Sequence, residues 1–556
     1  MKINDLYTVE GENLSGIPHN YYPRPQMRRN SFFCLNGEWD FYERIDAPCE
    51  KITVPFCPES LLSGIGRRLG KCPAPVYQKR FTLPENFIKS RVILHFGAVD
   101  QYASVFLNGK EIGEHAGGYE SFSFDITDAI MSENELTVYV FDELDTAVLP
   151  YGKQKEKRGG MWYTPVTGIW QTVWLESVPE KYIESLEIKT VNDTAIIKVN
   201  AISNGEVICE GKVFPIVNGA ATVKIDTPEY WSPENPRLYN FTVIAGEDEV
   251  QSYFALRTLE IKRVDGILRL CLNGKPYFFH GLLDQGYFPD GIFTPATEKG
   301  FENDILAMKE LGFNMLRKHI KVEPEQFYYD CDRLGMVVFQ DMVNNGKYSF
   351  FRDTALPTIG MKRFPNFLLH RSKETKVAFI DGMKSTVRQL QNHPCICYWT
   401  IFNEGWGQFD ADKVFEIMKE IDSSRFIDAT SGWFTGKKSD VTSLHVYFKP
   451  VKIKKSDKPT VLSEFGGYSY KLDEHSFNLD KTYGYKKFDD GALFMDALEK
   501  LYENEVIPLV KEGLCASVYT QVSDVEDETN GLYTYDRRVL KVDKERMKNI
   551  AAKLKI

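Results

Sequence analysis

The pattern of apolar and polar residues changes near residue 263. Before that point, short segments alternate apolar and polar residues, as in RVILHFGAVDQYASVFLNGKEIG and ELTVYVFDE, and helical periodicity is almost absent. Three dipeptides between such segments, Asn108-Gly109, Asn204-Gly205 and Asn218-Gly219, predict tight turns. The first part of the chain is therefore predicted to be β structure, with a small sandwich from about residue 182 to residue 257.

After residue 263, apolar runs alternate with amphipathic helical segments such as EKGFENDILAMKELG, EPEQFYYDCDRLG and VAFIDGMKSTVRQLQN. The apolar runs are YFFHGLLDQ, NMLRKHI, MVVFQDM, ICYWTIFNE, FIDATSG, SLHVY, TVLSEFGG and ASVYTQVSD. Eight strand–helix units over residues 263–556 predict a (β/α)8 barrel. An open doubly wound sheet is the alternative.

Polar residues gather at the carboxyl ends of these runs, where barrel enzymes place their active sites. They are Asp284, Arg317, His319, Asp341, Asn403, Glu404, His445, Tyr447, Glu464, Gln521 and Asp524. A helix–strand scaffold has no general structural need for such residues at one rim. We therefore expect them to form a binding or catalytic site.

Two of these residues are carboxylates that end an apolar run and precede glycines: Glu404 in FNEGWG and Glu464 in SEFGG. Two carboxylates across a pocket are what glycoside hydrolysis requires. A separation of about 5–5.5 Å gives retention of configuration, and a wider one gives inversion. For either glutamate alone, a buried structural carboxylate is the alternative.

Composition limits the classes of partner. The 556 residues have a net charge of −10, and no basic cluster is interleaved with aromatic residues, so we expect no nucleic-acid partner. No apolar stretch approaches the roughly 20 residues that span a bilayer, and the first residues lack the apolar core of a signal peptide. The ten cysteines include no CxxC pair. We expect a cytoplasmic protein with reduced thiols and no membrane partner.

Motifs along most of the chain resemble glycoside hydrolase family 2, which includes β-galactosidases, β-glucuronidases and β-mannosidases. They are LNGEWDFYE, VPFCPES, LHFGAVDQYASVFLNGKEIGEHAGGYESFSFDIT, GIWQTVWLE, WSPENPRLYNFTV, FALRTLEI, FNEGWG and SEFGG. The resemblance implies a multidomain β plus α/β protein. A jelly-roll sugar-binding domain over residues 1–180 and an immunoglobulin-like β-sandwich over residues 181–262 would precede a catalytic (β/α)8 TIM barrel over residues 263–556.

The resemblance also implies roles for individual residues. Glu404 resembles the general acid/base and Glu464 the nucleophile of a retaining, exo-acting, double-displacement glycosidase. Asn403 resembles the residue that binds the sugar 2-hydroxyl, Tyr447 one that orients the nucleophile, and Arg317 one that is held near it. The charge of Glu464 is expected to raise the pKa of Glu404 until the glycosyl-enzyme forms.

The remaining strand-end residues complete an expected substrate-binding set. Trp406 and Trp433 offer surfaces on which a sugar ring could stack. His319 and His445 are candidates for hydrogen bonds to sugar hydroxyls, and Asp284, Asp341 and Gln521 lie at the same rim. We expect no cofactor and no required metal, because FQDMVNNG lacks the glutamate–histidine magnesium site of the β-galactosidases of the family.

The segment EDETNGLYTYDRR bears on the choice of sugar. The glucuronidases of the family bind the sugar carboxylate with an Asn-x-Lys motif at this place. Aligning Gly531 puts Glu528, Thr529 and Asn530 there, without a cation for a carboxylate. We therefore expect a β-galactosidase ahead of a β-glucuronidase. The segment RKHIKVEP differs from the Ser-His-Tyr-Pro motif of β-galactosidases, so β-galactofuranosidase and arabinosidase stay open.

Two other classes of protein remain as alternatives. One is a non-catalytic carbohydrate-binding protein. The other is a barrel enzyme with a reactive lysine, for which Lys318 is the candidate. On the leading hypothesis the partner is an oligosaccharide or glycoside substrate, and a homo-oligomer is open. The long, aromatic 343–375 segment is expected to shape the mouth of the pocket.

Overall fold

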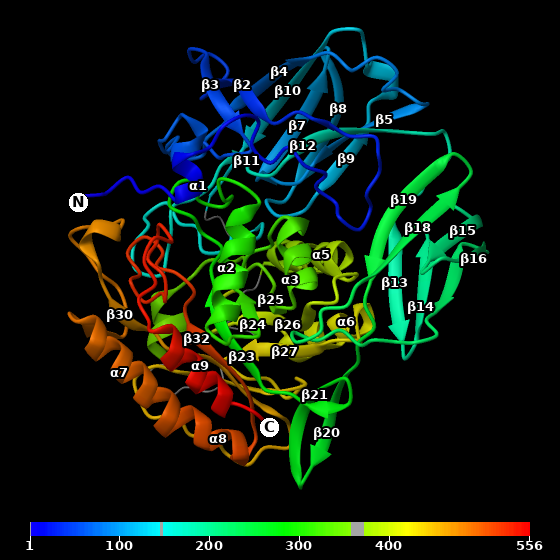
Figure 1. Cartoon of the computed structure of the whole chain (residues 1–556). Coiled ribbons are helices and arrows are strands. Elements are labelled where there is room, and N and C mark those ends of the chain that lie inside the picture. Colours follow the sequence, from blue (N-terminus) through cyan, green and yellow to red (C-terminus); the bar gives the residue numbers. More distant parts are fainter. Residues whose placement is uncertain (1, 145–147, 357–371) are drawn as a thin grey trace.

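A computed structural model describes residues 2–144, 148–356 and 372–556. Two antiparallel sheets form the N-terminal part of the chain (Figure 1). The first contains β1 (Phe33–Cys34), β12 (Val173–Val178), β5 (Arg91–Phe96) and β9 (Phe122–Asp125), in that order. The second contains β3 (Glu50–Val54), β2 (Gly37–Tyr42), β4 (Val76–Phe81), β10 (Asn134–Phe141), β7 (Tyr102–Leu107) and β8 (Lys110–Ala116). Their buried faces share one core that includes Trp39, Leu94 and Val138.

Two of the three predicted turns are confirmed. Asn108 and Gly109, with φ of 54° and 78°, join β7 to β8, and Asn218 and Gly219 join two strands of the next domain with φ of 51° and 79°. Positive φ at both positions is what a two-residue hairpin turn needs. The prediction for Asn204-Gly205 is wrong, because these residues begin β15 (Asn204–Cys209). A Cβ at Gly205 would lie 2.5 Å from the Ile244 carbonyl oxygen, so the glycine allows close strand contact.

The second domain is built from seven antiparallel strands with a core of its own, which includes Ile197, Val207 and Val243. Their order is β13 (Leu186–Val191), β14 (Thr194–Val199), β17 (Ala220–Lys224), β16 (Lys212–Val217), β15, β18 (Tyr239–Ala245) and β19 (Asp248–Phe254). Alternating burial along β18 places every second side chain in this core. A small sheet of β20 (Leu259–Val264), β21 (Ile267–Leu272) and β22 (Lys275–Pro276) leads into the third domain.

Eight parallel strands form the third domain, and each overlaps one of the eight predicted runs. They are β23 (Phe279–Asp284), β24 (Met315–Lys318), β25 (Val337–Asp341), β26 (Ile396–Asn403), β27 (Phe426–Ser431), β28 (Thr442–Val446), β29 (Thr460–Gly466) and β32 (Leu514–Thr520). The first strand, β23, pairs with both β24 and the last strand, β32. An open doubly wound sheet would not bring the first and last strands together, so the barrel prediction is confirmed.

Helices cover the outside of the barrel (Figure 1). Two predicted helical segments contain α2 (Lys299–Glu310) and α3 (Glu325–Leu334), and the third overlaps α5 (Lys373–Leu390), which begins four residues earlier than expected. These helices follow β23, β24 and β25. Further along the chain are α6 (Ala411–Ile421), α7 (Gly491–Leu501), α8 (Ile507–Glu512) and α9 (Lys544–Lys553). The connections 432–441 and 447–459, both fully described, contain no helix. The outer layer is therefore thinner beside β28.

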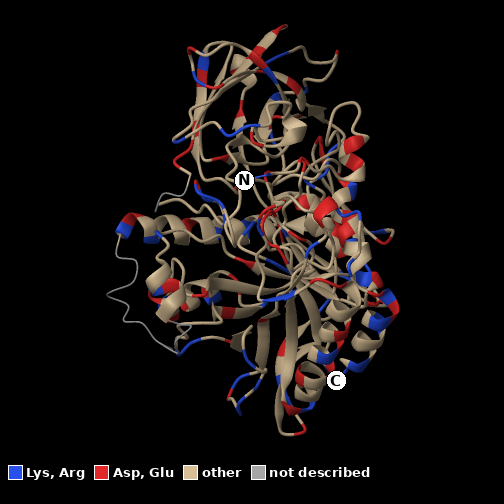
Figure 2. Cartoon of the chain, turned by 90° about the vertical axis from the view of Figure 1, so that its left-hand side faces the viewer, with Lys and Arg blue, Asp and Glu red and all other residues tan. Residues whose placement is uncertain are grey.

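Charges of both signs are interspersed on the helices of the barrel (Figure 2). Several are paired across neighbouring elements, as in Arg546–Glu499, Lys544–Glu310 and Lys553–Glu503. Exposed pairs of this kind contribute little to stability, roughly 0–1 kcal/mol each. Within the described residues, no helix combines the length and apolar character needed to cross a membrane.

Candidate active site

The carboxyl ends of β26 and β29 bring the two glutamates together. Glu404 directly follows β26, and its φ of 53° lies in the left-handed region that non-glycine residues rarely adopt. Gly405 comes next with φ of 77°, and a Cβ there would lie 2.1 Å from the Phe434 ring. The glycine thus lets the chain turn sharply beside Phe434, so that the carboxylate faces the centre of the barrel mouth.

His445, near the end of β28, lies between the two carboxylates. Its Nδ1 is 2.8 Å from Oε1 of Glu404 and 3.5 Å from Oε2 of Glu464. One oxygen of each glutamate and this nitrogen all lie within 4.8 Å of one another. Ser431 Oγ, 2.9 Å from Nε2, fixes the other side of the ring. The two carboxylates therefore approach each other closely, with one oxygen of each within 4.8 Å of the other.

Glu464 is buried and held by two donors. Arg317 Nη1 donates to Oε1 at 3.1 Å, and the Tyr447 hydroxyl donates to Oε2. Burial alone would raise the pKa of Glu464. The charges of His445 and Arg317, together with the Tyr447 hydrogen bond, outweigh burial and lower this pKa to about 2. The carboxylate is therefore ionised at neutral pH.

Arg317 itself is fixed by a network beneath Glu464. Asp341 accepts from Nε and Nη2, each at 3.0 Å, and Asn403 Oδ1 accepts from Nη2 at 2.8 Å. His319 Nδ1 lies 2.8 Å from Oδ2 of Asp341. Burial would raise the pKa of Asp341, but Arg317 and His319 outweigh it and keep this pKa below its ordinary value. The two-pronged contact fixes the plane of the guanidinium group.

Glu404 is less enclosed than Glu464. About 20% of its side chain is exposed, against 6% for Glu464. The centroid of the Trp433 ring lies 6.3 Å from that of the His445 ring. Trp406 is 5% exposed, and its ring packs edge-on against that of Trp162, with the centroids 4.8 Å apart. Trp406 therefore forms part of the wall of the barrel mouth.

Two predicted residues bind elsewhere within the described structure. Asp284 accepts from Lys318 Nζ at 2.6 Å and from the Gly286 amide at 2.9 Å. Gln521 is fully buried and bonds with Gln285, Glu528 and Asn530. No described hydrogen bond joins either residue to Glu404 or Glu464. Both remain predictions as substrate ligands.

The alternative of a reactive lysine at Lys318 is not supported by its surroundings. Burial would lower the pKa of Lys318, but Asp284 and Glu323 outweigh it and raise this pKa. Its ammonium is 2.9 Å from Oε1 of Glu323 as well as bonded to Asp284. A Schiff-base lysine needs a lowered pKa to be a neutral nucleophile.

Several residues near the site were not expected from the sequence. The Tyr485 ring stacks on Tyr447 at 3.9 Å, and Tyr163 of the first domain donates to Glu528 Oε2 at 2.8 Å. Tyr348, from the 343–375 segment, contacts Trp162 edge-on at 4.9 Å. Residues 357–371 of that segment lie outside the described residues. No local motif marks these residues, because their partners are far away in the sequence.

The donor atoms of Glu404, His445 and Glu464 are close enough together to hold a metal ion. Both oxygens of Glu464, however, already accept hydrogen bonds, and the Arg317 guanidinium group is 3.1 Å from Oε1. A second positive charge at this place would be repelled by Arg317.

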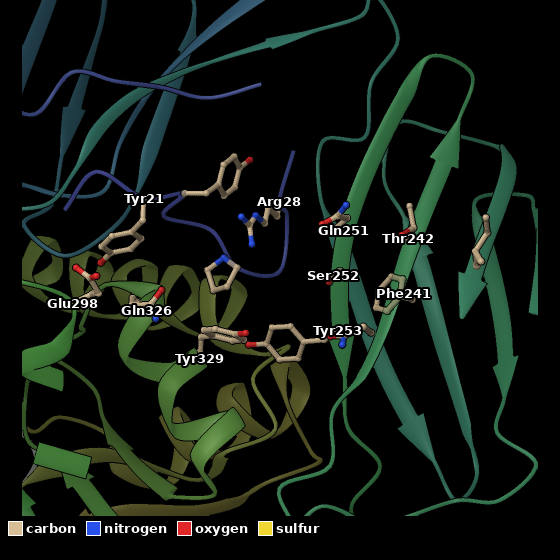
Figure 3. Close-up of a pocket in the computed structure, with 14 residues that line it drawn as sticks. Tyr21, Arg28, Phe241, Thr242, Gln251, Ser252, Tyr253, Glu298, Gln326 and Tyr329 are labelled. Carbon is tan, nitrogen blue, oxygen red and sulfur yellow. The ribbon is translucent and has the colours of Figure 1, made fainter. Parts of the chain in front are cut away.

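A separate cavity of about 550 Å³ lies outside the barrel mouth, between α3, β18, β19 and the N-terminal segment (Figure 3). Tyr329 on α3 and Tyr253 on β19 approach each other across it, with ring centroids 5.3 Å apart. Glu298 is the one carboxylate among its described lining residues. This cavity therefore lacks the pair of acids that glycoside cleavage requires.

Comparisons with known proteins agree with this architecture. The family profiles described as "Glycosyl hydrolases family 2, sugar binding domain", "Glycosyl hydrolases family 2" and "Glycosyl hydrolases family 2, TIM barrel domain" match residues 67–179, 178–257 and 264–469. A β-D-glucuronidase from Dictyoglomus thermophilum superposes with a TM-score of 0.75 at 18% identity, covering 96% of this chain and 98% of that one. A β-galacturonidase from Eisenbergiella tayi gives a TM-score of 0.69 at 19% identity, with coverage of 96% and 99%. These two similarities show the fold.

Three curated relatives are similar in sequence. A β-galactosidase from Thermoanaerobacter pseudethanolicus is 28% identical, covering 63% of this chain and 47% of the relative. A putative β-glucuronidase from Formosa agariphila is 25% identical, with coverage of 78% and 57%, and human β-glucuronidase is 26% identical, with coverage of 59% and 54%. The chain thus spans about half the length of these relatives. With its jelly-roll, immunoglobulin-like and TIM-barrel domains matched in order, the chain belongs to glycoside hydrolase family 2.

Proposed function

We propose that this protein is a retaining, exo-acting glycosidase that removes terminal sugars from a glycoside or oligosaccharide. The observation that supports this most directly is the approach of Glu404 and Glu464 to within 4.8 Å at the barrel mouth. Two carboxylates at about this distance suit double displacement, because the nucleophile must reach the anomeric carbon directly. The proposed domain limits remain 1–180, 181–262 and 263–556.

In the proposed reaction, Glu464 attacks the anomeric carbon while Glu404 gives its proton to the departing oxygen. A glycosyl ester on Glu464 results. Glu404, now ionised, takes a proton from water as this water attacks the anomeric carbon; the bond to Glu464 breaks, which releases the sugar and restores the carboxylate. The low pKa of Glu464 and the exposure of Glu404 both support this division of roles.

The surrounding residues receive supporting roles. Arg317 and Tyr447 hold the Glu464 carboxylate in position for attack, and Asp341 holds Arg317. Asn403 is proposed to donate its side-chain amide to the sugar 2-hydroxyl, because its Oδ1 is already occupied by Arg317. His445 contacts both glutamates and is proposed to position Glu404. His319 and Trp433 are proposed to face the sugar.

We propose a β-glucuronide as the substrate. Two of the three curated relatives reported above have glucuronidase names, and the expected preference for a galactoside is not confirmed by them. A β-galactoside is the second candidate. It is favoured by the name of the Thermoanaerobacter relative and by the buried Glu528, whose charge would repel a sugar carboxylate.

The test is release of nitrophenol from a panel of nitrophenyl glycosides. The panel contains β-glucuronide, β-galacturonide, β-galactopyranoside, β-galactofuranoside, α-L-arabinosides and β-mannoside. We expect turnover of the glucuronide, and loss of at least ~10⁴-fold in kcat/KM in Glu464→Ala. Glu474→Gln, an exposed glutamate on the surface, is the matched control.

Each alternative has its own outcome in this assay. Turnover of the galactoside alone would overturn the glucuronide proposal and leave the two-glutamate mechanism in place. Binding of sugars without turnover of any glycoside would favour a non-catalytic carbohydrate-binding protein. Turnover that survives Glu464→Ala would overturn the assignment of the nucleophile.

A further inference from the structure

A uronic acid at the end of a substrate brings a carboxylate that needs a cation when it leaves water. Most cations near the barrel mouth are already paired with protein carboxylates. Within the described residues these are Arg317 with Asp341 and Glu464, Lys318 with Asp284 and Glu323, Lys321 with Glu323, Arg158 with Glu526 and Asp527, and Lys541 with Asp524. None of them is free for a substrate carboxylate without breaking a pair.

Lys153 of the first domain is an exception. Its side chain is half-buried, and within the described part of the chain no acceptor lies within hydrogen-bonding or ion-pairing distance of its ammonium. The Nζ atom is 6.0 Å from the centroid of the Trp162 ring. A partly desolvated ammonium that no carboxylate contacts directly is electrostatically incomplete, and an anion from the substrate would complete it.

The backbone around Lys153 is fixed against the barrel. The amides of Tyr151 and Gly152 donate to the Asn344 carbonyl at 3.1 and 3.3 Å, just beyond β25. Gly152 has φ of 68°, and a Cβ there would lie 2.9 Å from the Ile320 carbonyl oxygen, just beyond β24. The backbone that precedes Lys153 is therefore anchored beside the ends of two barrel strands, next to Ile320.

The charge of Lys153 acts on two groups of the site. Burial lowers the pKa of His319, and the Lys153 charge adds to this while Asp341 opposes it. Burial raises the pKa of Glu528, and the Lys153 charge opposes that shift. Glu528 in turn interacts electrostatically with Glu464. The Lys153 charge thus acts both on His319 and on Glu528 of the last barrel loop.

We propose that Lys153 binds the carboxylate of a terminal uronosyl residue and so sets the preference of this enzyme for acidic sugars. The proposal rests on the glycosidase function given above and deepens its choice of substrate. The cation comes from the N-terminal domain, whereas both glutamates come from the barrel. Glu528, held by Tyr163 and Gln521, is the like-charged neighbour that weakens this contact.

The first experiment measures binding without turnover. Glucuronate, galacturonate, glucose and galactose are titrated into the full chain by calorimetry, for wild type, Lys153→Met, Lys153→Arg and the exposed control Lys157→Met. We expect wild type and Lys157→Met to prefer the uronates. We expect Lys153→Met to weaken uronate binding by about 10- to 100-fold, the effect of losing one charged hydrogen bond, and to leave neutral sugars unchanged. Lys153→Arg should restore part of the loss.

A preference for uronates that survives Lys153→Met would overturn the proposal, as would equal weakening of acidic and neutral sugars. The second experiment repeats the series with nitrophenyl β-glucuronide and β-galactoside. There the change should appear in KM for the glucuronide, with kcat much less affected. If no glycoside is turned over while uronate binding still depends on Lys153, the glycosidase proposal fails and the Lys153 site stands. Glu528→Gln should act in the opposite direction and tighten uronate binding.

Discussion

The two glutamates at the barrel mouth have opposite surroundings. Glu464 accepts from Arg317 and Tyr447, lies 3.5 Å from His445, and has 6% of its side chain exposed. Glu404 contacts His445 at 2.8 Å and has 20% of its side chain exposed. A nucleophile must stay ionised and fixed, which donors and a cation achieve. An acid/base must exchange protons with a leaving group and with water, and exposure permits this.

The two glutamates also differ in what holds them in place. Arg317 is itself held by two bonds to Asp341 and one to Asn403, so Glu464 is fixed by a group that cannot rotate freely. Glu404 is instead placed by its own backbone, in a left-handed conformation beside Gly405. Glu464, the proposed nucleophile, is thus positioned by side chains from three strands, and Glu404, the proposed acid/base, by a turn and by its contact with His445. Pre-organisation of the first kind reduces the motion needed to reach the transition state.

The largest effect should come from replacing each glutamate by glutamine. Glu464→Gln removes the nucleophile for every substrate, so kcat/KM should fall at least ~10⁴-fold whatever the leaving group. For a substrate with a poor leaving group, Glu404→Gln should lower kcat/KM by about 10²- to 10⁴-fold. For a dinitrophenyl glycoside, whose leaving group departs without a proton, the glycosylation step should be slowed little. The measurement is kcat/KM for a series of aryl glycosides of rising leaving-group pKa. Equal losses along the series in Glu404→Gln would contradict its role as acid.

A smaller effect is expected from Tyr447→Phe, which removes one of the hydrogen-bond donors that distinguish the surroundings of Glu464 from those of Glu404. Losing the hydroxyl donor should raise the pKa of Glu464 from about 2 and lower kcat/KM by about 10- to 100-fold. Only ionised Glu464 can attack, so activity is lost as the pH falls through this pKa. The acid limb of the pH–rate profile should therefore move to higher pH in the variant.

The profile is recorded from pH 7 downwards, with Tyr139→Phe, an exposed tyrosine of β10, as the control. An acid limb that stays in place would show that Tyr447 does not set the charge of Glu464. The same shift has a consequence for stability. Because the folded-state pKa lies below the ordinary value of 4.5, ionised Glu464 stabilises the fold above pH 4.5, and this contribution is lost as the pH falls towards 2.

The smallest effect should follow removal of metal ions. Dialysis against EDTA should leave kcat/KM within about two-fold, because protein donors and Arg317 already neutralise the Glu464 charge. Added zinc should inhibit, since it would compete for Glu404 and His445. Turnover is measured before and after dialysis. Activity that is lost to EDTA and restored by magnesium would contradict a metal-free mechanism.

The fold was predictable where burial is regular. Seven of the eight barrel strands are buried at every position because both of their faces are covered; β28 is the exception. Asn204-Gly205 was mistaken for a turn because the sequence does not distinguish two uses of glycine. A glycine can allow the backbone of a tight turn, or it can allow a neighbouring strand's carbonyl to approach closely, as it does here. The missing helices beside β28 depend on loop lengths that periodicity does not set.

The candidate site was predictable only as far as strand ends indicate it. Glu404 and Glu464 follow apolar runs and precede glycines, so their position could be inferred from the sequence. Asp284 lies at a strand end too, yet Lys318 of the next strand takes its carboxylate. Lys153 lies in another domain, and only the folded chain brings it to His319. The packing of the folded chain decides which strand-end groups are paired with neighbouring side chains and which are left to bind a substrate.

The hydrogen bonds from Tyr151 and Gly152 to Asn344 bear on how such proteins diversify in evolution. They hold a loop of the N-terminal domain beside the carboxyl ends of the barrel strands. The part proposed to perform the chemistry and the part proposed to select the sugar therefore lie on separate stretches of the chain. Recombination that exchanged the N-terminal domain would then present a new loop to an unchanged pair of glutamates. Such an exchange would change the preferred sugar in one genetic step and leave the barrel unchanged.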